Sequence, residues 1–351
     1  MRFTAALLAI LLTTGLAAAE RPMPLAGFLK APALWDAYKR SFVSPAGRVI
    51  DNANRGISHS EGQGYAMLIA VAADDRATFD LLWSWTRSSL LVRDDDLAAW
   101  RWDPAATPHV TDRNDASDGD VLIAWALVEA GQAWSKPAYA VAGLRIMRAL
   151  AATNLVETED GLALLPGSSG FGARDRADGP VVNPSYYVFP AFARFADIAP
   201  EGPWGGLGDA GLRLLAAART GPRSLPSDWV SLGGGPPAPA QGFDPVFGYD
   251  AIRIPLYLIW GGHADRKRLA TFERLFSDGA ATPQRIDVRS GETLGAMSDS
   301  GFGAIAALTR CALTGARLPA DLTSPTVDRY YATTLRALTL IVARQRYPQC
   351  L

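Results

Sequence analysis

The stretch ASDGDVLIAWALVEAGQAW, residues 116–134, decides the fold. Its apolar residues recur three or four positions apart, which is the spacing of one face of an α-helix; they are Ile123, Ala126, Leu127, Ala130 and Trp134. Asp118 and Asp120 stand just before this face, where a helix N-terminus favours acidic side chains. The stretch therefore predicts an apolar helix with carboxylates at its start.

The same spacing recurs along most of the chain. It predicts roughly ten helices and few strands, over residues 65–72, 79–86, 123–134, 143–150, 188–199, 205–219, 250–261, 265–277, 297–313 and 326–346. Two stretches rich in glycine and proline, 165–184 and 221–249, are expected to be long irregular loops with a functional role. We predict one all-α domain whose loops gather at one face. A closed toroid of helical hairpins is one such arrangement, although the spacing alone does not establish closure.

The bulk properties exclude several classes of protein. The chain has 351 residues, is 49% hydrophobic, and carries 34 basic against 35 acidic residues. This balance gives no basic surface for nucleic acid. Residues 1–19 combine Arg2, a short apolar run and three final alanines, as in a secretory signal cleaved after Ala19. We expect a mature chain, 20–351, that is exported to the periplasm or secreted and has no membrane span.

The two cysteines leave a question open. Cys311 and Cys350 are an even pair in a chain expected to be exported, where disulfides form. A bridge and two buried thiols both remain possible from the sequence.

Carboxylates are the main candidates for chemistry. Nucleotide-binding glycine motifs, HExxH and GxSxG do not occur, and the three histidines are scattered, so we expect no metal and no cofactor. Glu61, Asp118 and Asp250 each follow a turn and precede an apolar helix. Capping explains each of them singly, and Ser117 with Asp120 has the spacing of a capping box.

Hydrolysis of a glycosidic bond would explain why several carboxyl groups converge. One must donate a proton to the leaving oxygen, and another must activate water. Aromatic side chains near the predicted loops could stack on sugar rings; they are Trp100, Trp102, Tyr186, Tyr187 and Tyr249.

Residues 116–134 resemble the signature of glycoside hydrolase family 8. The matching positions are Ala116, Ser117, Asp118, Gly119, Asp120, Ile123, Ala124, Ala126, Leu127, Ala130 and Trp134. The segments SEGQGYAM (60–67) and YDAIR (249–253) resemble two further blocks of that family, in the same order. The resemblance spans most of the mature chain and implies an (α/α)6 barrel that cleaves β-1,4-linked glycans with inversion.

The resemblance also implies a role for each site residue. Glu61 would be the general acid and Asp250 the base, while Asp118 would hold sugar hydroxyls. Arg253 would contact the base or the sugar, and Tyr249 would border the attacking water. Substrate-binding positions would complete the site, at Trp100 or Trp102, Asp120 and Tyr186.

Within the family, the chain is most similar to the periplasmic endoglucanases that accompany bacterial cellulose synthase. That likeness implies cellulose chains as substrate, and association with the synthase complex as a possibility. Related members act on xylan, mixed-linkage glucan or chitosan. A non-catalytic polysaccharide-binding factor and a polysaccharide lyase are the competing classes, and the lyase is disfavoured by the scarcity of histidine and of basic clusters.

Overall fold

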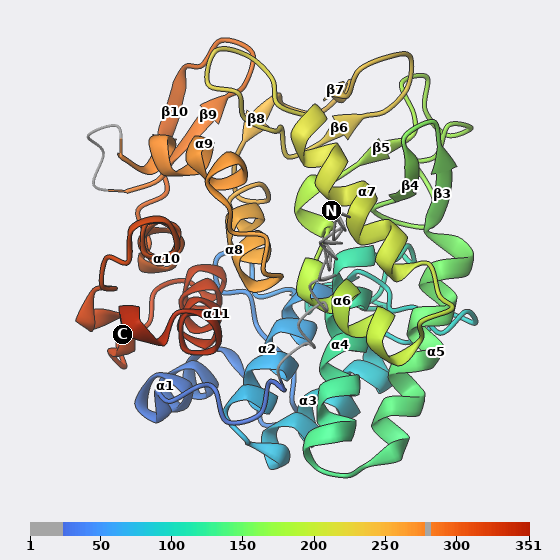
Figure 1. Ribbon diagram of the computed structural model, residues 1–351. Coiled ribbons are helices and arrows are strands. Elements are labelled where there is room, and N and C mark those ends of the chain that lie inside the picture. The colour runs from blue at the N-terminus through green and yellow to red at the C-terminus, as the bar shows by residue number, and fades with distance from the viewer. Residues whose placement is uncertain (1–23, 278–281) are drawn as a thin grey trace, which may run out of the picture.

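The computed structural model describes residues 24–277 and 282–351. The signal predicted at residues 1–19 lies outside these ranges. Within them the chain forms eleven α-helices (Figure 1), namely α1 (Pro32–Phe42), α2 (Ser60–Ala72), α3 (Arg76–Ser89), α4 (Ser117–Ala133), α5 (Pro137–Thr153), α6 (Phe189–Ile198), α7 (Trp204–Ala217), α8 (Arg253–Trp260), α9 (Arg266–Ser277), α10 (Ser300–Thr314) and α11 (Tyr330–Arg346).

The helices form two concentric layers. The inner ring consists of α2, α4, α6, α8, α10 and α11, and α11 packs against α2 to close it. Along the chain an outer helix precedes each inner helix except α11. Within the described ranges, the outer layer has five helices, and the segment that connects α10 to α11 forms only a short 3-10 helix, η2 (Ala320–Thr323), where a sixth outer helix would be expected. The predicted (α/α)6 barrel is confirmed.

Most inner helices are more buried than the outer ones, although α6 and α10 bury only about half of their residues. Every residue of α8 is buried, whereas α3 buries only Phe79, Leu82 and Thr86. Inner helices are apolar on nearly all sides because they contact both their neighbours and the outer layer. This explains why the all-round apolar stretch at 116–134 becomes an inner helix.

Close packing of α2 on α4 depends on glycine. A Cβ atom at Gly119 would lie 2.1 Å from Ser60 Oγ, and one at Gly64 would lie 2.6 Å from the Leu122 side chain. Such distances leave no room for a larger residue. The two glycines therefore bring the starts of α2 and α4 together.

Ten short strands occur in the described part of the chain, and the prediction of few strands was wrong. The strands labelled β3 to β10 lie in the upper part of Figure 1, among the loops. The bounds are β1 (Ser58–His59), β2 (Arg101–Trp102), β3 (Leu155–Thr158), β4 (Gly161–Leu164), β5 (Val181–Val182), β6 (Val230–Ser231), β7 (Ala238–Pro239), β8 (Val246–Phe247), β9 (Gln284–Asp287) and β10 (Thr293–Ala296).

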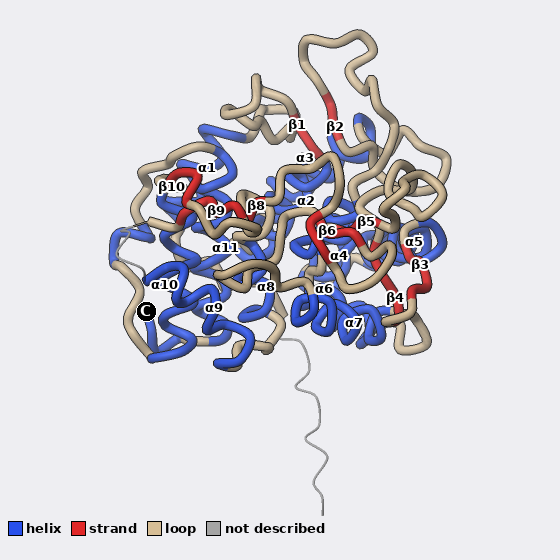
Figure 2. The backbone as a smooth tube through the Cα atoms, turned by 90° about the horizontal axis from the view of Figure 1, so that it is seen from above, coloured by secondary structure: helices blue, strands red, loops and turns tan. Residues whose placement is uncertain are grey.

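These strands pair antiparallel in four small sheets, which Figure 2 shows as separate red segments among the loops. The sheets are ordered β1-β2, β3-β4, β5-β6-β7 and β10-β9-β8. β5 lies in the predicted loop 165–184, and β6, β7 and β8 lie in 221–249, so both loops are partly ordered by pairing. Strands of two to four residues carry too little periodicity to be predicted from sequence.

Helix α1 was also missed by the sequence analysis. It starts with Pro32 at its first position, where proline is tolerated, and buries Leu34, Trp35, Ala37, Tyr38 and Phe42. Within this helix, the ring of Trp35 stacks on the ring of Tyr38. The helix covers α11 from outside.

The start and the end of the described chain are both tied to the body. Leu25 N–H donates to Glu129 Oε2 at 3.2 Å, and Gln345 Nε2 donates to the Pro24 carbonyl oxygen at 3.1 Å. A disulfide joins Cys311 in α10 to Cys350, with Cα atoms 6.1 Å apart, which resolves the question that the sequence left open. Among the described residues, no helix is long and apolar enough to cross a membrane.

Candidate active site

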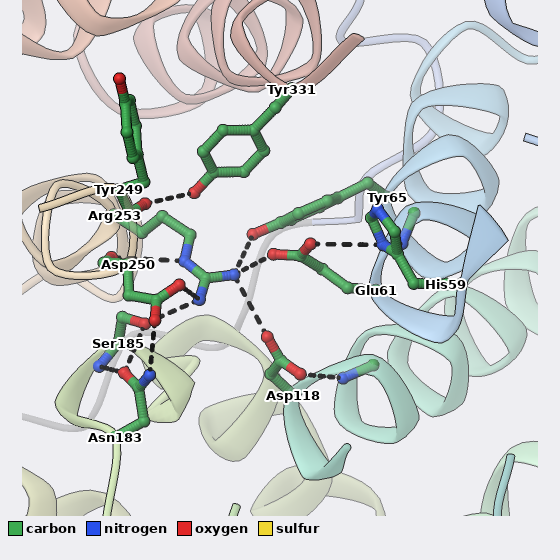
Figure 3. A network of polar contacts seen from close by, with 12 residues as sticks. His59, Glu61, Tyr65, Asp118, Asn183, Ser185, Tyr249, Asp250, Arg253 and Tyr331 are labelled. Carbon is green, nitrogen blue, oxygen red and sulfur yellow. Dashed lines mark hydrogen bonds and ion pairs between the residues drawn. The ribbon is translucent and has the colours of Figure 1, made fainter. Parts of the chain in front are cut away.

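The guanidinium of Arg253 is the centre of a buried polar cluster (Figure 3). Nη1 donates to Glu61 Oε1 and, at 3.2 Å, to Asp118 Oδ2. Nη2 donates to Asp250 Oδ1 at 3.3 Å and to Ser185 Oγ at 2.8 Å. One side chain thus brings together the three carboxylates that the sequence analysis selected.

The cluster lies where inner helices begin. Glu61 is in the first turn of α2, Asp118 is in the first turn of α4, and Arg253 starts α8. Helix N-termini carry partial positive charge and favour anionic groups. Convergence of several N-termini therefore helps to hold three carboxylates in one place.

Exposure divides the cluster into a buried floor and reachable groups. The side chains of Arg253 and Asp118 are 1% and 4% exposed, whereas those of Glu61 and Asp250 are 19% and 33% exposed. A ligand can therefore reach Glu61 and Asp250 more readily than the residues beneath them.

Asp250 is fixed on both oxygens. Its Oδ2 accepts a hydrogen bond from Asn183 Nδ2 at 3.0 Å, and its Oδ1 accepts from Arg253. Asn183 Oδ1 in turn accepts from Ser185 Oγ at 2.8 Å. These residues close a ring of hydrogen bonds with Arg253, which leaves Asp250 one preferred orientation.

Glu61 has a histidine on its other side. His59 Nδ1 accepts from Gly62 N–H at 3.1 Å, so His59 caps α2, and the same nitrogen lies 3.5 Å from Glu61 Oε2. His59 Nε2 lies 3.4 Å from Asp51 Oδ2. Burial lowers the pKa of His59, but the hydrogen bond to Asp51 and the charge of Glu61 outweigh burial and raise it.

The surroundings of Asp118 change the pKa of its carboxyl group. Burial, together with the negative charge of Glu61, raises the pKa of Asp118 to about 7, although Arg253 acts in the opposite direction. A desolvated carboxyl beside another carboxylate holds its proton more tightly. Asp118 therefore titrates close to neutral pH.

Comparisons with known proteins agree with this arrangement. A sequence model of the glycosyl hydrolases family 8 matches residues 8–345. The chain belongs to glycosyl hydrolase family 8. A family 8 chain is a glycoside hydrolase, so the carboxylate cluster is the candidate active site of an enzyme that cleaves glycosidic bonds.

Individual relatives of this family 8 chain are named endoglucanases. An endoglucanase of Cellulomonas uda is 41% identical over 73% of this chain and 68% of its own length. A probable endoglucanase of Novacetimonas hansenii is 37% identical over 88% of both chains. The crystal structure of a family 8 endoglucanase, Cel10 from Klebsiella pneumoniae, superposes with a TM-score of 0.81 at 38% identity, covering 89% of this chain and 99% of that one.

Two of the selected tyrosines flank the cluster of the family 8 chain. The Arg253 guanidinium lies 5.6 Å from the ring centre of Tyr186, and Tyr249 precedes Asp250 with 45% of its surface exposed. Tyr331 supports Tyr249 by donating a hydrogen bond to its carbonyl oxygen at 2.8 Å. Tyr187, by contrast, is 1% exposed and belongs to the core.

Trp100 and Trp102 have different surroundings. The Trp100 carbonyl oxygen accepts a hydrogen bond from Ser60 N–H at 3.0 Å, directly before Glu61. Trp102 is enclosed by side chains on several sides, with centroid distances of 4.2 Å to His109, 5.8 Å to Trp85 and 4.8 Å to the Arg48 guanidinium. The Trp100 ring also has side-chain partners, because its Nε1 donates to Asp112 Oδ2 at 2.8 Å and the Arg101 guanidinium lies 5.8 Å from its centre. Which of the two tryptophans stacks on a sugar stays a prediction.

Asp120 is not brought to the cluster. It is fully buried, and its Oδ1 accepts a hydrogen bond from Ala98 N–H at 2.9 Å, so it anchors the loop before α4. Burial and the charge of Asp115 raise its pKa well above the ordinary value. A side chain in this place cannot contact a sugar, and we correct the expectation that Asp120 binds substrate.

The capping box at Ser117 and Asp120 is also not formed. The N-cap residue of α4 is Ala116, one position earlier, and its methyl group cannot accept a hydrogen bond. Within the described ranges, Ser117 Oγ is buried without a hydrogen-bond partner. The spacing was right for a capping box, but the helix begins one residue too early for it.

Sequence reasoning missed Asn183, Ser185 and Asp228. The first two lie in NPSYY beside the selected Tyr186, and an asparagine before proline in a functional loop was the available signal. Asp228 lies in the loop 221–249, which the sequence analysis marked as functional without selecting the residue. In residues 24–277 and 282–351, no group of three or more His, Cys, Asp or Glu side chains is arranged to hold a metal ion.

Proposed function

We propose that this family 8 enzyme is an endo-β-1,4-glucanase that cleaves internal bonds of cellulose chains with inversion. The observation that carries the proposal is the arrangement of Glu61 and Asp250 on different nitrogens of Arg253, with Asp118 beneath them. The substrate class is supported by relatives named endoglucanases, one of which is 41% identical.

Glu61 is the proposed general acid and Asp250 the proposed base. The base must be ionised and aimed at a water molecule, and the hydrogen bonds from Asn183 and Arg253 provide that orientation. An inverting pair needs room for water, with the carboxyl groups about 6.5–9.5 Å apart, whereas a retaining pair is about 5–5.5 Å apart. The two carboxylates contact different terminal nitrogens of Arg253 and not each other, and the proposal expects their separation to fall in the inverting range.

The remaining residues are proposed to bind the sugar. Asp118 would accept hydrogen bonds from sugar hydroxyls in the cleavage subsite, because it lies beside Glu61 on the same guanidinium. Tyr186, Tyr249 and Trp100 would provide aromatic faces for the C–H faces of the sugar rings. Arg253 would change partners as the sugar enters.

We also propose a place of action. Residues 1–19 would direct export and be removed after Ala19, which leaves a single catalytic domain, 20–351, in the periplasm or outside the cell. A role beside cellulose synthesis is part of the proposal because the sequence resembles the family 8 endoglucanases that accompany bacterial cellulose synthase. Association with a cellulose synthase complex is part of this proposal.

The test is a side-by-side assay of the purified mature enzyme. Release of reducing ends is measured on carboxymethyl cellulose, xylan, mixed-linkage glucan and chitosan, and NMR follows the anomer formed first from a cello-oligosaccharide. The proposal predicts fastest release on carboxymethyl cellulose and the α-anomer as first product. Faster release on another polymer would show that this polymer, and not cellulose, is the preferred substrate. A β-anomer as first product would exclude inversion. No release on any polymer would favour a non-catalytic binding factor.

A further inference from the structure

Asp228 contacts the turn that carries Asp250 from a separate segment. It lies between α7 and β6, and only 8% of its surface is exposed. Its Oδ1 accepts hydrogen bonds from Gly248 N–H and Ala251 N–H, both at 2.9 Å. These two N–H groups lie on either side of Asp250 in the chain.

The contact satisfies the backbone ahead of α8. The first N–H groups of a helix have no partner within the helix, and a side-chain oxygen at the N-cap usually accepts from one of them. The N-cap residue of α8 is Ile252, whose apolar side chain cannot accept a hydrogen bond. The carboxylate of Asp228, which belongs to another loop, accepts hydrogen bonds from the N–H groups of the turn just before the helix.

The position of Asp228 is itself fixed. Its own N–H donates to the carbonyl oxygen of Val246, the first residue of β8, at 2.7 Å. A Cβ atom at Gly248 would lie 2.7 Å from Asp228 Oδ2, so the carboxyl fits only because residue 248 is glycine. Asp228 is therefore held tightly against both β8 and the turn.

The charge state of Asp228 does not decide whether the contact forms. Burial and the negative charge of Asp250 raise the pKa of Asp228 to about 7, while the two backbone N–H groups and Arg253 lower it. A carboxylate oxygen accepts hydrogen bonds when ionised, and the carbonyl oxygen of a protonated carboxyl still does. Asn can replace this function, because its side-chain oxygen is also an acceptor.

We propose that Asp228 is a positioning residue for Asp250, because it fixes the backbone on both sides of the base. The inference rests on the proposed role of Asp250. The carboxylate of Asp250 then reaches the substrate from a turn whose place is set by the loop 221–249. Without Asp228, the turn 248–251 would lose two backbone hydrogen bonds and could shift. The Asp250 carboxylate would then no longer be held in the orientation that Asn183 and Arg253 now give it.

The test compares Asp228→Ala, Asp228→Asn and the matched control Asp178→Ala. Asp178 is also an aspartate with 8% exposure, and it accepts Gln241 N–H at 2.7 Å, away from the turn 248–251. We measure kcat and KM on carboxymethyl cellulose and the melting temperature of each variant. D228A should lower kcat by about 10- to 100-fold with KM changed by less than about threefold, since small misplacement of a catalytic group is costly.

The two other variants separate positioning from general destabilisation. D228N should keep most of kcat, and D178A should keep kcat even if its melting temperature falls as far as that of D228A. A kcat of D228A within about twofold of wild type, or a D228N as impaired as D228A, would overturn the inference. If the wild-type enzyme releases no reducing ends from any glucan, the proposed function fails instead.

Discussion

Glu61 and Asp250 bind different terminal nitrogens of one guanidinium, because Glu61 accepts from Nη1 of Arg253 and Asp250 accepts from Nη2 at 3.3 Å. The proposed acid and base are thereby linked through a single side chain that is 1% exposed. Each carboxylate keeps one oxygen that Arg253 does not bind: Glu61 Oε2 lies 3.5 Å from His59 Nδ1, and Asp250 Oδ2 accepts from Asn183 at 3.0 Å.

Glu61→Gln should abolish turnover while leaving substrate binding nearly intact. An amide keeps the shape of the side chain but cannot donate a proton to the leaving oxygen, and general acid catalysis contributes about 10²–10⁴-fold. The measurement is kcat on carboxymethyl cellulose together with calorimetric binding of cello-oligosaccharides. A variant with near-normal kcat would show that Glu61 has no catalytic role and is only an acidic residue favoured at the N-terminus of α2.

Arg253→Met should destabilise the folded protein more at pH 8 than at pH 5. Removing the shared cation leaves buried carboxylates unpaired, which costs about 3–5 kcal/mol for a buried ion pair. At pH 5 the loss is smaller, because Asp118, with a pKa of about 7, is then protonated. Urea unfolding at the two pH values measures the difference, and equal losses at both would contradict the prediction.

Asp118 and Asp228 should make the protein less stable as pH rises towards neutrality. Both have a pKa of about 7 in the folded state, against an ordinary value of 3.8. The folded state therefore binds these protons more tightly than the unfolded state. Their stabilising contribution is complete below about pH 4 and is lost as pH rises through about 7, by up to about 1.4 kcal/mol per pH unit for each group.

Asp118→Asn and Asp228→Asn should each flatten this dependence when the free energy of unfolding is measured from pH 4 to 8. Asp178→Asn is the control. Burial raises the pKa of Asp178, but the hydrogen bond from Gln241 N–H and the charge of Arg176 outweigh burial and lower it. Asp178 therefore titrates below pH 4, and replacing it should leave the slope of unfolding free energy against pH unchanged above pH 4. An unchanged slope in both test variants would contradict the assignment.

Trp100→Ala and Trp102→Ala should have different effects. Trp100 lies beside the start of α2, so its loss should raise KM with a small change in melting temperature. Trp102 is partly buried and packs on His109 and Arg48, so its loss should lower the melting temperature. The cost in stability should stay below the about 3–5 kcal/mol of a fully buried tryptophan. Paired thermal melts and steady-state kinetics distinguish them, and the reverse pattern would assign sugar stacking to Trp102.

Cys311→Ser with Cys350→Ser should lower stability and leave activity unchanged. The bridge closes a loop between residues 39 positions apart. In the chain-entropy description, a loop of this size contributes about 4 kcal/mol. Urea unfolding measures the loss, and wild type treated with a reductant should reproduce it. A fall in kcat in the folded double variant would show that α10 also positions the active site.

The sequence was most informative where function and local structure coincide. Glu61 and Asp118 stand in first helical turns, and Asp250 lies in the turn just before α8, so a short window contains both the helix signal and the acidic side chain. The inner helices α2, α4 and α8 are also strongly apolar, so their spacing, together with the family resemblance, allowed the barrel to be predicted.

The parts that were missed depend on contacts between distant segments. Asn183 and Asp228 reach the turn of Asp250 from two different loops, and nothing local to either residue identifies that partner. The two-residue strands β5 and β6 exist because they pair with each other, so neither has a signal alone. The capping box at Ser117 was wrong because α4 begins one residue earlier than its spacing requires, and a sequence pattern does not fix a helix boundary to a single residue.

The anchoring of Pro24 and Leu25 determines how the enzyme would sit on a support. These residues bind Gln345 and Glu129, near the C-terminal ends of α11 and α4, whereas Glu61 and Asp118 lie at the opposite ends of the inner helices. A linker joined ahead of Pro24 would therefore attach to the face of the barrel away from the carboxylates. An enzyme immobilised in this way would present its active site outward, open to a long insoluble polymer.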